Sequence, residues 1–139
     1  MVGKMNKAIL LIVWLGLLST SFADSTNWHS VAEDVIKHID EVEVAYLKNR
    51  PIEAKKAVVS AYFGVFEDRK MEAAMRTELG AKHTYQVERL FGDLRKAVQK
   101  SQASAEVSGI AESIRIAMRR DGAALDKAGI PMAVFQVNQ

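Results

Sequence analysis

The chain has 139 residues, of which 49% are hydrophobic, and this length is sufficient for one globular domain with its own core. It contains no cysteine, which excludes disulfide bonds, thiolate metal sites and covalently attached haem. The 19 basic and 17 acidic residues give a formal net charge of +2, too small an excess to indicate a nucleic-acid partner.

Residues 1–23 are typical of a secretory signal peptide. Lys4 and Lys7 precede an apolar stretch of 11 residues, 8–18, and the small residues Ser21 and Ala23 follow it. A membrane-spanning helix needs about 20 apolar residues, so a retained anchor is the less favoured interpretation. We therefore expect cleavage near Ala23 and a periplasmic or secreted protein. Loss of the two lysines leaves 17 basic and 17 acidic residues, so the exported chain is formally neutral.

Two helices are predicted in the first half of the exported chain. Apolar residues recur at three- and four-residue steps over residues 28–46, after the potential capping side chains of residues 25–27, and Pro51 ends this pattern. A second helix is predicted from Pro51 to about residue 68, with Gly64 inside it. Because glycine destabilises a helix interior, we expect a neighbouring helix to approach closely at Gly64. The predicted buried stripe of the first helix is Trp28, Val31, Val35, Ile39, Val42 and Tyr46.

The second half of the chain predicts at least two more helices. After a weakly marked break at residues 68–70, a third element begins near Met71, and its apolar pattern resumes beyond Gly80 as far as residue 98. This element is either one helix bent at Gly80 or two separate helices. Residues 99–105 form a polar loop by composition, and a last helix is predicted over residues 105–128, followed by Gly129 and Pro131.

Four amphipathic segments without any alternating apolar pattern predict an all-α fold. The connections between them are short, which favours an antiparallel four-helix bundle. We assign this bundle to residues 24–131, and residues 132–139 form a C-terminal tail without a clear assignment.

The sequence offers little support for an enzyme or for the usual cofactors of helical bundles. There is no Glu-x-x-His motif, no glycine-rich phosphate loop and no nucleophile beside a base. His38 with Asp34 and Glu41, or His29 with Glu33, could provide metal ligands, but hydrogen bonding along an exposed helix face explains both groups. Non-covalent haem between a methionine and a histidine stays open. We expect a protein without enzymatic activity.

The strongest candidate for a binding site lies in residues 61–76, AYFGVFEDRKMEAAMR. Glu67 and Glu72 flank the predicted break, so a turn between them would let both carboxylates face one opening. The Tyr62 hydroxyl, Asp68 or Glu43 could add further oxygen atoms. Hard oxygen ligands suit iron, manganese, magnesium or calcium.

A structural role for the two glutamates needs no metal. Glu72 would favour a helix N-terminus through the helix dipole, and Glu67 would pair with Arg69 or Lys70 in solvent. The spacing of the residues alone favours this second interpretation.

Residues 46–76 resemble the extracytoplasmic N-terminal helical region of some bacterial Ftr-type iron permeases. In that region a helix ending in an "aYF..FE" pattern is followed by "(L/M)E.A(I/M)". A later segment with an acid, an aromatic residue and "LR" is similar to VERLFGDLRKAV at residues 87–98. This chain departs from the permeases in lacking their Arg-Glu-x-x-Glu iron motif and any apolar span after residue 23. The matched positions of the first segment are Tyr62, Phe63, Phe66, Glu67, Met71 and Glu72.

The resemblance implies a stand-alone exported module that binds or hands over iron or another divalent metal, or that docks on an inner-membrane iron permease or another envelope protein. Among the matched positions, Tyr62, Glu67 and Glu72 offer oxygen ligands. Two alternatives stay open. One is a ligand-free periplasmic interaction module in which Tyr62, Phe63 and Phe66 belong to the core, and the other is a bundle that binds haem or a small molecule.

Overall fold

The computed structural model describes residues 26–135, so the predicted signal peptide lies outside the described residues. Within this range the chain is all-α, without a β-strand. None of the helices in this range is long and apolar enough to cross a membrane. The five α-helices are α1 (Trp28–Leu47), α2 (Pro51–Val59), α3 (Met71–Glu78), α4 (Ala81–Gln99) and α5 (Ser104–Lys127). A π-helix, η1 (Ser60–Glu67), continues α2, and a 3-10 helix, η2 (Met132–Phe135), follows α5.

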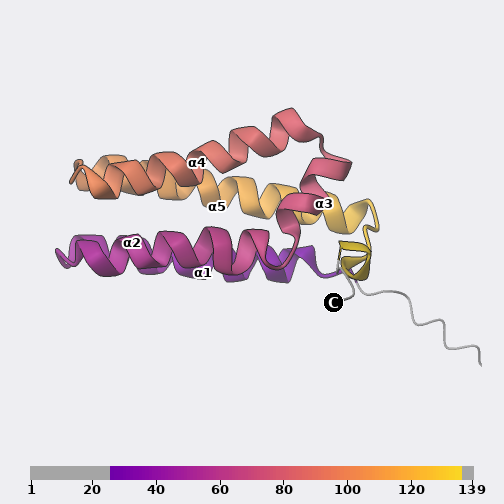
Figure 1. Ribbon diagram of the computed structural model, residues 1–139, viewed down its shortest axis with the longest axis horizontal. Coiled ribbons are helices and arrows are strands. Elements are labelled where there is room, and N and C mark those ends of the chain that lie inside the picture. The colour runs from indigo at the N-terminus through magenta and orange to yellow at the C-terminus, as the bar shows by residue number, and fades with distance from the viewer. Residues whose placement is uncertain (1–25, 136–139) are drawn as a thin grey trace, which may run out of the picture.

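The longer helices lie alongside one another, as Figure 1 shows. α1 packs against α2 and α5, and α4 packs against α5 and α2. The connection between α1 and α2 and the connection between α4 and α5 lie at the same end of the molecule (Figure 1). Helix α3 crosses at the other end and links η1 to α4. The described residues therefore form one more α-helix than the four that were predicted.

The first predicted helix is confirmed, and its apolar stripe is buried from Trp28 to Val42. The side chain of Asn27, at the N-cap position of α1, makes no capping hydrogen bond. Instead Asp126 of α5 accepts hydrogen bonds from the backbone N–H of Trp28 at 2.8 Å and of His29 at 3.0 Å. A residue remote in sequence thus satisfies the first turn of α1.

Two sharp turns separate η1, α3 and α4. The break predicted at residues 68–70 is confirmed, and Lys70 marks it with a left-handed φ of 65°. Such a conformation costs a non-glycine residue about 1–2 kcal/mol, yet the turn forms at Lys70, where no glycine or proline marks it in the sequence. At Gly80 the φ of 93° ends the helical path, so the element beyond Met71 is two helices. The loop between α4 and α5 is shorter than the one predicted at residues 99–105, because α4 extends to Gln99 and α5 begins at Ser104.

The second predicted helix needs two corrections. Its path is α-helical only to Val59, and the wider turns of η1 follow. The close approach expected at Gly64 is also wrong, because a Cβ atom built there would have no neighbour within 4 Å. The helices approach instead at Gly122 of α5, where a Cβ would lie 3.1 Å from the Cβ of Ala32 and from the carbonyl oxygen of Trp28.

Candidate functional site

The π-helix η1 supplies the aromatic residues of the predicted site. Phe66 is buried and stacks on Phe91 of α4 with a centroid distance of 5.2 Å, and Tyr62 contacts the same ring at 5.4 Å. The ligand-free interaction module predicted that Phe63 belongs to the core. This is wrong, because 55% of the surface of Phe63 is exposed. π-helical turns are rare and occur often at functional sites, which agrees with a functional role for this segment.

An acidic pair lies beside these rings. Glu72 is in the first turn of α3, and Glu88 is in α4. The Nη2 atom of Arg76 donates a hydrogen bond to Glu72 at 2.5 Å and to Glu88 at 3.0 Å. The two carboxylate side chains are 19% and 20% exposed, whereas that of Arg76 is half exposed. One guanidinium therefore bridges two carboxylates that are mostly shielded from water.

The electrostatics of the pair show how close the acidic groups are. Burial raises the pKa of Glu88, and the hydrogen bond to Glu72 and the charge of Glu72 raise it further. Arg76 opposes this increase in the pKa of Glu88, and Glu67 adds a smaller increase. Glu88 therefore holds a proton more tightly than an isolated glutamate does.

Tyr62 is held in the same negative field. Burial raises the pKa of Tyr62 to about 12, and the charges of Glu88, Glu72 and Glu67 contribute to this shift. The structure therefore gathers the three predicted residues Tyr62, Glu67 and Glu72, and it adds Glu88 and Arg76. Glu88 was not among the residues selected from the sequence, although it is one of the two acids of the VERLFGDLRKAV segment.

Glu43, another oxygen ligand considered from the sequence, does not join this group, which we call the acidic cluster (Glu67, Glu72 and Glu88). Glu43 forms an ion pair with Arg115 of α5, so the expectation that it would approach Glu67 and Glu72 is wrong. Arg69 pairs with Asp34 of α1 and not with Glu67. The position of Glu72 in the first turn of α3 fits the structural interpretation as well.

The histidines give no metal site of the kind considered from the sequence. Nδ1 of His38 lies 2.8 Å from Glu41, a contact along one exposed helix face. Among residues 26–135, no group of three or more histidine, cysteine, aspartate or glutamate side chains is arranged to hold a metal ion. With Arg76 between Glu72 and Glu88, the acidic cluster binds a guanidinium.

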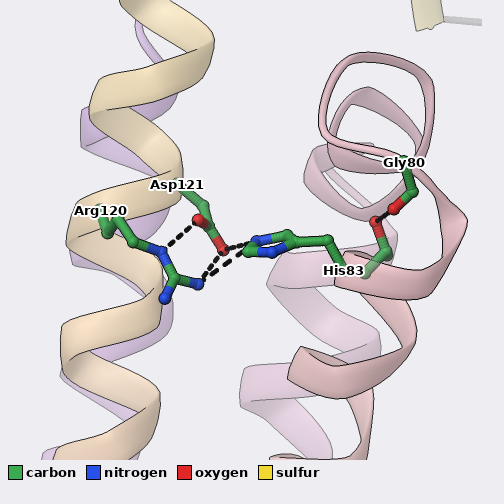
Figure 2. A network of polar contacts seen from close by, with 5 residues as sticks. Gly80, His83, Arg120 and Asp121 are labelled. Carbon is green, nitrogen blue, oxygen red and sulfur yellow. Dashed lines mark hydrogen bonds and ion pairs between the residues drawn. The ribbon is translucent and has the colours of Figure 1, made fainter.

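A second polar network, which was not predicted, ties α4 to α5. Figure 2 shows the buried Asp121 between His83 and Arg120. Arg120 donates to the two oxygens of Asp121 at 2.8 and 3.1 Å, and Nε2 of His83 lies 3.0 Å from Oδ2. Beside it, the Thr84 hydroxyl donates to the carbonyl oxygen of Gly80 at 3.1 Å. Every oxygen of this buried carboxylate has a partner, which favours a structural role.

Comparison of the chain with known protein families, with curated proteins and with solved structures found no match. The residues of the acidic cluster and their surroundings therefore carry the argument about function.

Proposed function

We propose that this protein is an exported, non-enzymatic helical protein that binds iron or another divalent metal ion at Glu67, Glu72 and Glu88 in the course of metal uptake. In the described conformation these three carboxylates are not arranged as a metal site, so binding requires them to move together. One observation carries the proposal. The two segments that resemble the permease region, residues 46–76 and 87–98, both contribute carboxylates to the surroundings of Tyr62: Glu67 and Glu72 come from the first and Glu88 from the second. Carboxylates from η1, α3 and α4 would meet a hard cation with the oxygen ligands it prefers.

Arg76 stands where the cation would be. Its guanidinium is the positive charge that the acidic cluster holds in the metal-free protein, and its half-exposed side chain has access to solvent. A divalent ion would bring two positive charges to Glu72 and Glu88 in place of one. Metal binding then requires Arg76 to turn outward, and Arg76 acts as a competitor of the metal ion.

Tyr62 has a defined part in this proposal. With a pKa of about 12 its phenol stays protonated at neutral pH, so its hydroxyl is available as a hydrogen-bond donor. It becomes a ligand only for a cation acidic enough to displace the phenol proton, as Fe³⁺ is. The choice between ferrous and ferric iron would thus depend on Tyr62.

The architecture belongs to the proposal too. We infer that α1, α2 with η1, α4 and α5 make an antiparallel four-helix bundle, and that α3 crosses one end of it beside the acidic cluster. Such a module, cleaved from its signal peptide, would hand its metal to an inner-membrane iron permease or to another envelope protein.

Calorimetric titration with Fe²⁺ under anaerobic conditions, and with Mn²⁺, tests the metal site. We expect saturable binding to the wild type and a loss of at least tenfold in affinity for Glu72→Gln combined with Glu88→Gln. Glu41→Gln combined with Glu53→Gln is the matched control, because both carboxylates are exposed and remote from Tyr62. Arg76→Met should bind more tightly than the wild type. Absence of saturable binding, or equal binding by both double variants, would contradict the proposal.

A second candidate function is the ligand-free interaction module. Large apolar side chains are exposed along α2 and η1, among them Ile52 at 81% and Phe63 at 55%. In that case Phe63→Ser would abolish recovery of an envelope protein in a pull-down, and the Glu72→Gln and Glu88→Gln variants would behave as the wild type.

A further inference from the structure

An apolar groove of about 160 Å³ runs between α2 with η1 on one side and α4 on the other. Tyr62 and Phe91 form part of its lining. Val59 and Phe63 border it with 47% and 55% of their surfaces exposed. Apolar side chains at a groove of this kind are usually covered by another helix.

Gly92 points to what covers the groove. It lies inside α4 and lines the groove, and glycine weakens a helix interior relative to alanine. Within residues 26–135 a Cβ atom at position 92 would meet nothing within 4 Å, so packing inside this part of the chain does not require glycine. A helix of another molecule that crosses α4 at this point would make use of the missing side chain.

Charges on α4 indicate which molecule that is. Glu88, Gly92 and Arg95 are spaced at i, i+4 and i+7, so they share one helix face, and all three line the groove. Glu88 shares a single guanidinium with Glu72 and is short of positive charge. Arg95 makes no ion pair or side-chain hydrogen bond with the other described residues. The groove is therefore acidic toward α3 and basic toward the other end of α4.

We propose that this groove is the interface between two copies of the chain, in which the two α4 helices run antiparallel around a twofold axis beside Gly92. Glu88 precedes Gly92 by four residues and Arg95 follows it by three. The twofold axis therefore places Glu88 of each copy opposite Arg95 of the other, as a self-complementary interface requires. Each copy supplies the second positive charge that the Glu72–Glu88 pair of its partner lacks, and Phe63 becomes covered.

The dimer goes beyond the proposed cation site. It shares Glu88 with that site, but it needs no metal ion, and neither Gly92 nor Arg95 is a proposed metal ligand. Sedimentation of the full chain in buffer with EDTA separates the two proposals, since a dimer under these conditions needs no metal. We expect a concentration-dependent dimer for the wild type. Arg95→Glu and Glu88→Arg should each be monomeric, because each places like charges opposite one another.

An equimolar mixture of Arg95→Glu and Glu88→Arg is the decisive sample. Every facing pair in a mixed dimer is then one acid and one base, so the mixture should dimerise although neither variant does alone. Gly92→Leu should also be monomeric. Gly109→Leu is its control, since Gly109 is likewise an exposed helix glycine with no neighbour within 4 Å of a Cβ. Circular dichroism confirms that each variant is folded.

Three results would overturn the proposal. The first is a wild type that stays monomeric at about 1 mM protein, because a dimer with a Kd of about 1 mM would be half formed at that concentration. The second is a dimer that persists in Gly92→Leu and Arg95→Glu, which would place the interface elsewhere. The third is a mixture of the two charge variants that stays monomeric.

Discussion

Arg76 of α3 donates a hydrogen bond to Glu88 of α4 at 3.0 Å, and through this contact the short helix α3 is fixed to the longer helix α4. The same nitrogen binds Glu72 at 2.5 Å. Because one positive charge serves two carboxylates, the acidic cluster keeps an excess of negative charge beside Tyr62. This imbalance underlies the proposed affinity for a metal ion and for the partner's Arg95, and it also has measurable consequences in the isolated chain.

Glu88→Gln should change the pH dependence of stability. The pKa of Glu88 in the folded protein lies above its ordinary value of 4.5. The folded state therefore binds more protons than the unfolded state between 4.5 and the raised pKa, and the free energy of unfolding falls as the pH rises through this window. The glutamine variant lacks this contribution, so its stability relative to the wild type should increase from pH 4 to pH 8.

Urea unfolding at several pH values measures this difference. Glu53→Gln is the control, because Glu53 is an exposed carboxylate paired with Arg50 across one turn. Its stability should stay within about 0.5 kcal/mol of the wild type over the range, as is usual for surface substitutions. Parallel pH profiles for Glu88→Gln and the wild type would show that Glu88 titrates as an isolated glutamate.

Tyr62 should ionise at a higher pH than an ordinary tyrosine. Its pKa is raised to about 12 from the ordinary value of 10, so the unfolded chain loses the phenol proton first. Stability from Tyr62 is complete below pH 10 and is lost as the pH rises toward 12. Tyrosinate absorbance should show one titration step near 12 that disappears in Tyr62→Phe. The same step should persist in Tyr85→Phe, whose ring is 60% exposed. A wild-type titration complete near pH 10 would contradict this assignment.

The apolar pattern predicted where most helices lie. α1 and α5 begin and end within one or two residues of the predicted bounds. A continuous apolar stripe defines each amphipathic helix, and Pro51 after α1 and Gly129 with Pro131 after α5 mark where the stripes end. The π-helical turns of η1 have no such signal in the local sequence. They accompany the packing of Phe66 against Phe91 of a distant helix. The sequence also gives no local signal for the cap of α1, because Asp126 provides it from α5.

The candidate site was predictable in part for the same reason. Glu67, Glu72 and Tyr62 are close in sequence, so a turn at Lys70 suffices to bring them together. The sequence alone could not single out Glu88, because that choice depends on which face of α4 meets α3. Glu43 forms an ion pair with Arg115 of α5 instead. Spacing along one helix does not reveal such a contact between helices.

Removal of the buried carboxylate in the second network should weaken the α4–α5 contact. Asp121→Ala leaves His83 and Arg120 without their shared acceptor, and we expect a loss of about 1–3 kcal/mol in the free energy of unfolding. His83→Gln and Arg120→Gln should each cost about 1 kcal/mol or less, because both side chains reach solvent. Urea unfolding measures all three. A cost for Asp121→Ala no larger than that for Arg120→Gln would show that the network contributes little beyond a surface pair.

Substitution of two glycines tests where the helices meet most closely. A leucine at position 122 would have to displace the Cβ of Ala32 and the backbone of Trp28, which lie 3.1 Å from the Cβ position. Gly122→Leu should therefore destabilise the protein by about 1–3 kcal/mol through overpacking. Gly64→Leu meets open space and should stabilise by up to about 1 kcal/mol, since leucine favours helical backbone over glycine. Thermal unfolding of both variants measures the contrast, and the reverse order would place the close contact at η1 instead of at the crossing of α1 and α5.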